Sequence, residues 1–193
     1  MEEPLEILLA GSGGQGQGLA GVLLARSFAE EEGKNVLETE AYGISMRGGH
    51  SRSEVLVSSR EINDLRVTEP DILLVMSQAA ADTFIPRVKK GGVILLDSTY
   101  VKDIPETEAK IFAFPFTEEA RSLGREAIAN VIALGATASI SPMISKRSLE
   151  NTLRKAFDSP VRELNLQALD RGYELGGKQK QGVRHGKERA GNS

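Results

Sequence analysis

The stretch LEILLAGSGGQGQGLAGVLLARSFAEEEG, residues 5–33, decides the fold class of this 193-residue protein. It opens with a short apolar run that stops at glycines, as is typical of a buried parallel strand. Apolar residues then recur at helical spacing along residues 14–33, and Gly33 is a natural helix stop. Because NVLETE at residues 35–40 has the pattern of a second strand, the segment predicts a βαβ unit.

The rest of the chain continues this alternation of strands and helices. Residues 53–59 alternate apolar and polar side chains, which indicates a strand with one solvated face, antiparallel to the others. Residues 71–77, 92–98 and 109–116 give three further strands, and the pattern after residue 117 is helical. We therefore predict an α/β protein: a single three-layer α/β/α domain over residues 5–175, with a mostly parallel Rossmann-like sheet and C-terminal helices.

Composition excludes several classes of function. With 40% hydrophobic and 26% charged residues, the chain is that of a folded globular protein. The last 18 residues carry five Lys or Arg against one Glu, so this segment is +4 and the remainder −7. An acidic body argues against a nucleic-acid partner. We predict that residues 176–193 form a basic disordered tail; the alternative is an arm that docks on an acidic partner.

The sequence contains no cysteine. This excludes a disulfide framework, a thiol nucleophile and a thiolate-ligated metal or iron–sulfur site within the chain, and we expect no metal site. There is no apolar run long enough to span a membrane, and the acidic N-terminal residues lack the basic region of a signal peptide. We expect a cytoplasmic protein without a membrane partner.

The glycine-rich turn GSGGQG, residues 11–16, matches a dinucleotide-binding fingerprint at Gly11, Gly13 and Gly16. Glu38 or Glu40 stands where an acidic residue would meet a ribose. The alternative is that the glycines supply only a tight turn and close helix packing. A dehydrogenase also needs a substrate-holding segment and a proton-transfer residue, and the chain offers few candidates for either.

A second unusual segment is AYGISMRGGHSRSEV, residues 41–55. Arg47 lies beside glycines that allow close approach, and its guanidinium suits carboxylate or phosphate. If the second strand ends near Glu40, this loop lies beside the glycine turn at the carboxyl edge of the sheet. The alternative is a flexible surface loop with solvated charges, which we favour for Arg52 and Ser53. We interpret His50 as a hydrogen-bonding loop residue.

Three further positions have alternatives. Asp97 follows an apolar strand and is interpreted as the cap of the next turn, rather than as a ribose or metal ligand. Asn130 lies in an otherwise apolar helix, at an exposed edge or in a buried hydrogen bond across an interface. The alternating phenylalanines of residues 112–116 are expected to pack in or near the core.

Taken together, these motifs resemble a known family. GSGGQG, EAYGISMRGGHSRSEVLVSS, PDILLVMS, GGVILLDS and REAIANVIALGA are similar, in order and spacing, to segments of the gamma subunit of 2-oxoacid:ferredoxin oxidoreductases. The 2-oxoglutarate type is the most similar. The likeness covers about residues 5–175 and leaves out the basic tail.

The resemblance implies a subunit of a complex that oxidatively decarboxylates a 2-oxoacid with coenzyme A, giving acyl-CoA, carbon dioxide and reduced ferredoxin. It implies thiamine diphosphate, magnesium and iron–sulfur clusters on partner subunits: alpha, beta and, in some complexes, a ferredoxin-like delta chain. The gamma chain is then expected to be inactive alone and to contain no catalytic residue. The alternatives are a stand-alone NAD-dependent oxidoreductase and a regulatory module that binds an anion or nucleotide.

The resemblance also assigns site residues, at a subunit interface or at the border of the coenzyme A site. The sequence departs from the family pattern in two places: Ile44 and Ser45 stand where the family often has an acidic residue, and His50 stands where it has a small or apolar one. These departures leave the particular 2-oxoacid open, because indolepyruvate and branched-chain members have similar domains. The assigned residues are Gly11, Gly13, Gly14, Gln15, Gly16, Tyr42, Gly43, Arg47, Gly48, Gly49 and Asn130.

Overall fold

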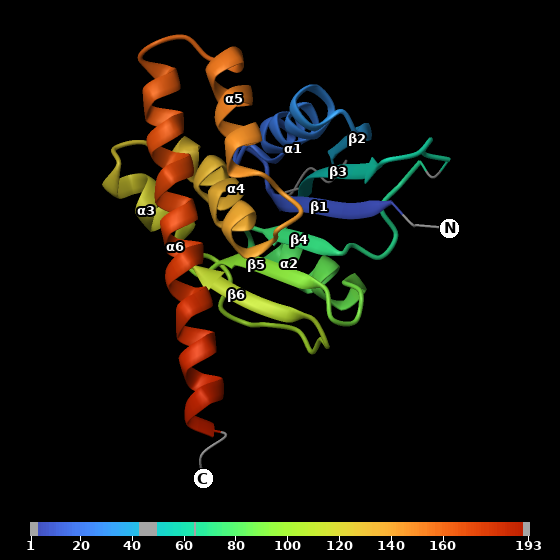
Figure 1. Ribbon diagram of the computed structural model, residues 1–193. Coiled ribbons are helices and arrows are strands. Elements are labelled where there is room, and N and C mark those ends of the chain that lie inside the picture. The colour runs from blue at the N-terminus through green and yellow to red at the C-terminus, as the bar shows by residue number, and fades with distance from the viewer. Residues whose placement is uncertain (1–3, 43–49, 64, 191–193) are drawn as a thin grey trace.

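The computed structural model describes residues 4–42, 50–63 and 65–190, with the backbone alone for residues 42, 50 and 180–190. This part of the chain forms a six-stranded sheet in the order β2-β3-β1-β4-β5-β6 (Figure 1). The strands are β1 (Leu5–Ser12), β2 (Asn35–Tyr42), β3 (His50–Ser58), β4 (Ile72–Val75), β5 (Val93–Asp97) and β6 (Lys110–Phe114).

Helices cover the two faces of the sheet unequally. Five α-helices pack on one face, whereas α2 and loops cover the other. This confirms the predicted α/β fold class, with a thinner third layer on the α2 side. The helices are α1 (Gln17–Arg26), α2 (Gln78–Phe84), α3 (Phe116–Ser122), α4 (Ala129–Ile140), α5 (Lys146–Ala156) and α6 (Val161–Ala190), with the short turns η1 (Ser27–Glu31), η2 (Ile85–Arg87) and η3 (Glu126–Ile128).

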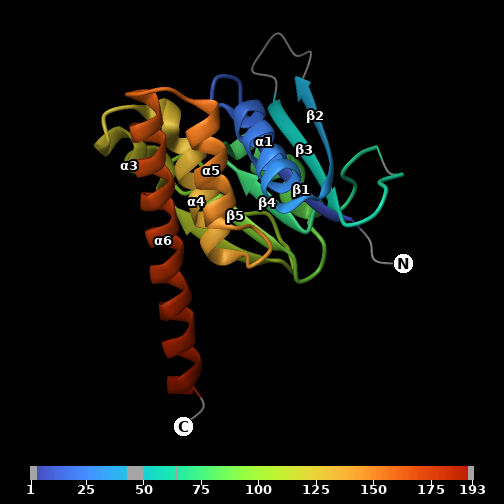
Figure 2. The same ribbon diagram turned by 45° about the horizontal axis from the view of Figure 1, so that its top comes forward.

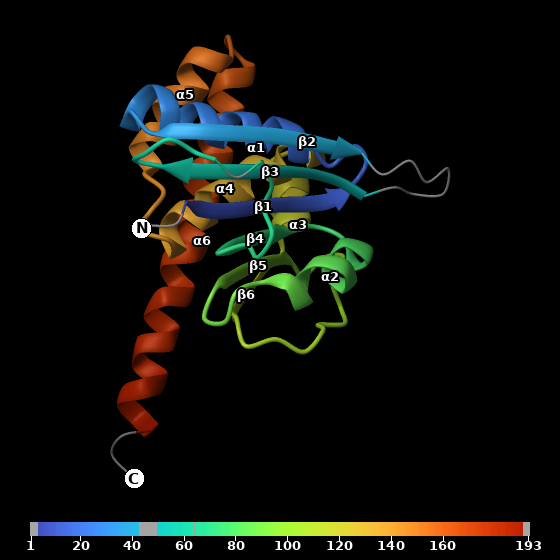
Figure 3. The same ribbon diagram turned by 90° about the vertical axis from the view of Figure 1, so that its right-hand side faces the viewer.

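Strand β3 runs against all its neighbours. It pairs antiparallel with both β1 and β2, whereas β1, β4, β5 and β6 pair in parallel, as the arrows in Figure 3 show. The predicted, mostly parallel sheet with one antiparallel strand is therefore confirmed. The first βαβ unit differs from the simplest expectation, because β3 lies between its two strands and moves β2 roughly 10 Å away from β1.

Alternation along the strands divides the core in two. In β1, Ile7 and Leu9 face the five-helix layer, while Leu8 and Ala10 face α2. The phenylalanines predicted as core and near-core residues lie in the five-helix layer: Phe114 and Phe116 are buried, and Phe112 packs against them half-buried.

Helix α4 is buried at each of its twelve residues. Figure 1 shows it between the sheet and α6. A glycine in each helix lies against the backbone of the other helix, which allows α4 and α6 to approach closely. A Cβ atom added to Gly135 would lie 2.1 Å from the carbonyl oxygen of Leu169, and one added to Gly172 would lie 1.8 Å from that of Ile132. The two helix backbones are therefore in direct contact.

The C-terminal segment differs from the predicted disordered tail. Helix α6 continues to Ala190, and its last turns extend beyond the sheet (Figure 2). Lys, Gln, Glu and Arg are good helix formers, so a segment too polar to build a core can still continue an existing helix. The side-chain amide of Gln179 donates to the carbonyl oxygen of Ala113 at 3.0 Å, which links this segment to the edge strand β6. The domain boundary near residue 175 stays a prediction.

Within the described ranges, no helix is both long and apolar enough to cross a membrane. Helix α6 has the length, but its sequence is rich in charged and amide side chains. The cytoplasmic location stays a prediction.

The glycine contact between α4 and α6 can be tested with two alanine variants in one helix. We expect Gly172→Ala to lower the free energy of unfolding by about 3 kcal/mol, because its Cβ cannot fit against backbone atoms. Gly177→Ala is the control: its Cβ would lie 3.8 Å from the nearest atom, Ser139 Oγ, so the helix gains up to ~1 kcal/mol. Urea unfolding of both variants measures the difference, and equal effects would contradict the close contact.

Candidate functional site at the glycine turn

The glycine turn joins β1 to α1 at the carboxyl edge of the sheet, where β4, β5 and β6 also end. Gly14 and Gly16 have φ angles of 88° and 72°, a backbone conformation that residues other than glycine rarely adopt. Gly16 in this left-handed conformation is the N-cap of α1. These two glycines are therefore required by the backbone.

Gln15 holds the turn to the neighbouring strand. Its side-chain Oε1 accepts a hydrogen bond from the backbone N–H of Ser12 at 2.7 Å. Its Nε2 donates to the carbonyl oxygen of Met76, just beyond β4, at 2.8 Å. Both ends of the amide are thus engaged within the chain, and Gln15 acts as a brace across the edge of the sheet.

Asn130 holds the other side of the turn from α4. The residue is 1% exposed, its Nδ2 donates to the carbonyl oxygen of Gly16 at 2.9 Å, and its Oδ1 accepts from the backbone N–H of Val131 at 2.8 Å. Of the two alternatives for Asn130, the structure supports a buried hydrogen bond. The bond lies within the chain rather than across an interface.

A polar groove opens beside the turn. It has a volume of about 560 Å³, and a smaller hollow of about 250 Å³ shares Gly14, Gln15 and Glu126 with it. The described lining of the groove contains no lysine or arginine. The lining residues are Ser12, Gly13, Gly14, Gln15, Ser77, Gln78, Ala79, Tyr100 and Glu126.

A hydrogen-bonded triad forms one wall of this groove. The Tyr100 hydroxyl donates to Glu126 Oε1 at 3.0 Å and accepts from Arg121 Nη2 at 2.9 Å, while Arg121 Nε donates to Glu126 Oε2 at 2.9 Å. The hydrogen bond to the Glu126 carboxylate, together with burial, raises the pKa of Tyr100. Hydrogen bonds from Arg121 and Tyr100 lower the pKa of Glu126. The positive charge of Arg121 is therefore already paired.

The segment of residues 41–55 meets the turn as predicted where it is described. Ser12 is in register with His50, and Ser51 is in register with Tyr42 on the other side. The end of β2 and the start of β3 thus lie at the same edge of the sheet as the end of β1. The predicted site residues Gly43, Arg47, Gly48 and Gly49 lie outside the described residues, as does the side chain of Tyr42.

The interpretation of Arg52 and Ser53 as solvated loop residues is wrong. Both lie in β3, where sheet pairing orders the backbone. Ser53 is fully buried and its hydroxyl donates to Glu38 Oε1 at 2.6 Å. Arg52 pairs with the buried carboxylate of Glu54 at 3.0 Å. Successive side chains of a strand point to opposite faces of the sheet, and this alternation determines where Arg52 and Ser53 lie. The loop-like composition of the segment did not indicate it.

Among the described residues, the sheet order differs from that of a dinucleotide site. Glu38 is hydrogen-bonded to Ser53, and β3 lies in the sheet between β2 and β1, the strand that leads into the glycine turn. The remaining glycines of α1 serve packing instead: a Cβ added to Gly21 would lie 1.8 Å from Ser53 Oγ, and one added to Gly18 would lie 2.1 Å from Glu40 Oε1. A tight turn with close helix packing is the alternative that the geometry supports.

Asp97 is a cap, as predicted. It is fully buried; Oδ1 accepts from the N–H of Thr99 at 3.0 Å, and Oδ2 accepts from the hydroxyl of Thr117 at 2.5 Å. These bonds occupy the carboxylate and order the chain after β5. Within the described ranges, no group of three or more His, Cys, Asp or Glu residues is placed to hold a metal ion.

Sequence reasoning did not identify Ser77, Tyr100 or Glu126 as groove residues. Ser77 follows β4 and Tyr100 follows β5, so their places after parallel strands were an available signal. Glu126 had no such signal, because it reaches the groove from η3, just before α4.

The fold and site define a class of protein. The chain is an α/β domain with a groove beside a glycine turn that the amides of Gln15 and Asn130 hold in place, and its sequence contains no cysteine. Residues 6–175 match the pyruvate ferredoxin/flavodoxin oxidoreductase family, and the chain belongs to this family.

Individual relatives agree with this assignment. The chain is 38% identical over 173 residues to the 2-oxoglutarate synthase subunit KorC of Methanocaldococcus jannaschii, covering 88% of this chain and 92% of that protein. KorC of Methanothermobacter thermautotrophicus is 35% identical over 177 residues, covering 88% and 94%. The crystal structure of the keto/oxoacid ferredoxin oxidoreductase gamma subunit from Geobacter sulfurreducens superposes with a TM-score of 0.80 at 35% identity, covering 89% and 97%.

The Asn130 brace predicts a local effect on the turn. Asn130→Asp keeps the acceptor for Val131 but loses the donor to Gly16, which should cost about 1–3 kcal/mol of stability. It should also speed amide hydrogen exchange in residues 13–17. Asn165→Asp is the control, because Asn165 is similarly buried and donates to the carbonyl oxygen of Val161, within α6. Faster exchange at the turn in both variants would contradict a specific brace.

The triad predicts that Tyr100 deprotonates at a higher pH than an ordinary tyrosine. Because a tyrosinate at position 100 would face the Glu126 carboxylate, Glu126→Gln should lower the pKa of Tyr100 toward its ordinary value. Tyrosinate absorbance against pH, with Tyr100→Phe subtracted to isolate this one of three tyrosines, measures the change. Glu118→Gln, a charge change in α3 outside the triad, serves as the control. An unchanged titration in Glu126→Gln would refute the pairing.

Proposed function

We propose that this chain is the gamma subunit of a 2-oxoacid:ferredoxin oxidoreductase that acts on 2-oxoglutarate. The observation that carries the proposal is near end-to-end similarity to two KorC subunits of 2-oxoglutarate synthase, at 38% and 35% identity. The gamma subunit of known structure supports the same role, since its fold coincides with this chain over most of both.

The reaction needs groups that this chain does not provide. Oxidative decarboxylation of a 2-oxoacid to a thioester releases carbon dioxide and two electrons, which ferredoxin accepts one at a time. The chain has no cysteine to ligate an iron–sulfur cluster, and its described residues hold no metal-binding cluster. We infer that thiamine diphosphate, magnesium and the clusters reside on alpha, beta and, where present, delta partners, and that this chain shapes the interface between them.

We infer that the groove would border only part of a bound coenzyme A. Its described lining contains hydroxyl groups, the Glu126 carboxylate, which accepts from Tyr100 and Arg121, and the amides of Gln15 and Gln78, which are hydrogen-bonded within the chain. Because this described lining has no lysine or arginine, it suits an uncharged part of the molecule better than phosphates. We therefore assign the phosphate contact to Arg47 or to a partner subunit, with the glycine turn bordering the site.

Reconstitution tests the proposed function. We expect the purified chain to show no 2-oxoglutarate-dependent reduction of ferredoxin, and the complex with its alpha and beta partners to show it, with coenzyme A required. Pyruvate and 3-methyl-2-oxobutanoate are the matched substrates, expected to react more slowly. Activity of the complex without this chain, or faster turnover of either control substrate, would contradict the proposed role or substrate.

The role of Arg47 is tested in the same complex. Arg47→Ala should raise the apparent KM for coenzyme A by ~10-fold or more, because a charge-assisted hydrogen bond to phosphate is lost. Arg125→Ala, which removes an exposed arginine next to Glu126 of the groove, is the control and should leave KM unchanged. An unchanged KM in Arg47→Ala would show that the residue does not border the coenzyme A site.

A further inference from the structure

The two edges of the sheet differ. At one edge, β6 is five residues long, and the carbonyl oxygen of its Ala113 accepts from Gln179 of α6 at 3.0 Å. At the other edge, β2 is eight residues long and pairs with β3 alone. Figure 3 shows β2 along the outer side of the sheet, with α1 behind it. An edge strand presents a row of backbone N–H and C=O groups with which another strand can pair.

The direction of the backbone groups in β2 follows from hydrogen bonds further into the sheet. In β1, the carbonyl oxygens of Glu6 and Ala10 accept from Asp71 and Met76, on the β4 side. Backbone groups alternate along a strand, so the odd-numbered residues of β1 face β3. By the register of the three strands, the odd-numbered residues of β2 then face β3 and the even-numbered ones face outward. Glu38, in the middle of β2, therefore directs its backbone N–H and C=O away from the sheet.

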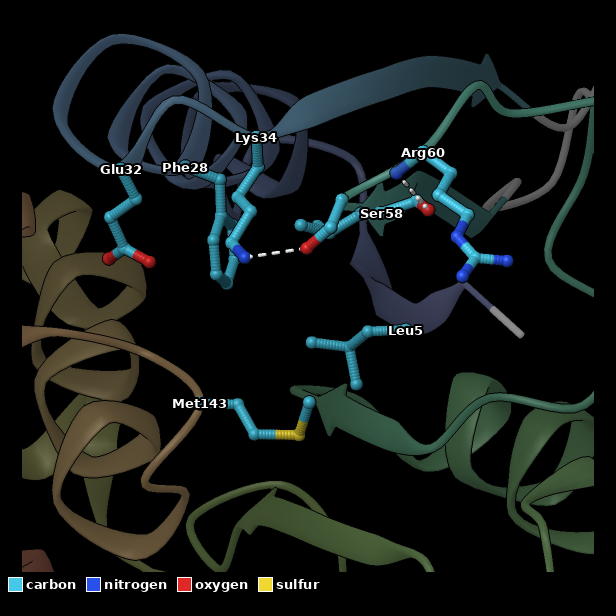
Figure 4. A pocket seen from close by; sticks show the side chains of 9 residues that line it. Leu5, Phe28, Glu32, Lys34, Ser58, Arg60 and Met143 are labelled. Atoms are coloured by element: carbon cyan, nitrogen blue, oxygen red, sulfur yellow. Dashed lines mark hydrogen bonds between the residues drawn. The ribbon is translucent and has the colours of Figure 1, made fainter. Parts of the chain in front are cut away.

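Strand β2 lacks the features with which proteins usually block a free edge. Its sequence, NVLETEAY, contains no proline and no lysine, and its register with β3 runs without a bulge. Lys34, which precedes the strand, donates to Ser59 Oγ at 2.8 Å and so links the start of β2 to the end of β3 (Figure 4). Within the described ranges, the outward groups of Val36 and Glu38 have no partner strand.

Apolar side chains flank this edge on both faces of the sheet. On the α2 face, Leu37 packs partly buried against the core. On the other face, Gly18 of α1 lies against Glu40, since an added Cβ would be 2.1 Å from Oε1. Val22 is one helical turn further on the same side of α1 and is 38% exposed. A strand added beside β2 would cover both Leu37 and Val22.

The charge of β2 favours a basic partner over a second copy of this chain. The strand carries the carboxylates of Glu38 and Glu40 and no Lys or Arg, so two copies side by side would bring like charges together. Helix α5 and the chain that joins it to α6 also rise past β2 in Figures 1 and 3. A whole second domain therefore has less room at this edge than a single extended segment.

We propose that an extended, basic segment of a partner subunit pairs with β2 and adds a seventh strand to the sheet. It hydrogen-bonds to the outward groups of Val36 and Glu38, and it carries a Lys or Arg near the carboxylates of β2. Its side chains on opposite faces contact Leu37 and Val22. The identity of the partner rests on the proposed function.

The surface is continuous with the interface proposed at the glycine turn. Strand β2 ends at Tyr42, directly before the segment that contains Arg47. A partner that contacts this segment and continues along β2 needs only one extended stretch of chain.

Residue-resolved amide hydrogen exchange, on this chain alone and in the complex with its alpha and beta partners, tests the proposal. We expect the amides of Val36 and Glu38 to exchange at least ~10-fold more slowly in the complex, because each gains a hydrogen bond. The amides of Leu37 and Thr39, which face β3, are the internal control and should change less. If the complex forms while Val36 and Glu38 keep their exchange rates, the strand pairing is wrong and the proposed function stands. If no complex forms, both fail.

Two variants at one position separate the backbone from the side chain. Glu38→Pro removes the outward N–H and the carboxylate, whereas Glu38→Ala removes the carboxylate alone; both lose the hydrogen bond to Ser53. Proline is tolerated in an edge strand where the N–H faces away from the sheet. We expect Glu38→Pro to bind the alpha and beta partners at least ~10-fold more weakly than Glu38→Ala. Equal binding would overturn the proposal.

Two further outcomes are decisive. If Glu38→Pro does not fold, hydrogen exchange in the unmodified complex decides alone. A dimer of the isolated chain in which the amides of Val36 and Glu38 exchange slowly would overturn the proposal, since it would show that a second copy occupies the edge.

Discussion

The backbone contact between α4 and α6 is the constraint on which the rest of this structure depends. A helix with no polar face must be covered on every side, and α4 is covered by the sheet on one side and α6 on the other. Gly135 and Gly172 make this possible, because any larger residue at either position would meet a carbonyl oxygen. The long C-terminal helix is thus an integral layer of the domain.

The position of α4 in turn determines the candidate site. The first turn of α4 places Asn130 at the carbonyl oxygen of Gly16. Gln15 ties the glycine turn to Met76, just beyond β4. The glycine turn therefore keeps its shape without a ligand. The amides of Gln15 and Asn130 hold the glycine turn, and Arg121 is paired with Glu126. With these groups engaged within the chain, the surface is suited to contact with other subunits. This agrees with the proposed role as a subunit whose redox chemistry lies on partner chains.

The antiparallel strand β3 explains why a glycine fingerprint need not indicate a nucleotide site. In a dinucleotide-binding sheet, the acidic residue that meets the ribose lies on the strand next to the glycine turn. Here β3 occupies that place, and Glu38 bonds instead to Ser53 of the inserted strand. The same insertion places His50, at one end of the segment that contains Arg47, in register with Ser12, and Tyr42, at the other end, one strand further from the turn.

The sequence by itself determined the strand and helix periodicities, the need for glycine in the turn, the capping role of Asp97 and the family, because each is written in local spacing or short motifs. Only the tertiary structure decided the place of β3, the burial of Ser53, the use of Gln15 and Asn130 as braces, and the entry of Glu126 into the groove. These depend on contacts between distant residues, such as the 114 positions from Gly16 to Asn130. Local patterns carry no information about such pairs, because they arise only when the layers pack.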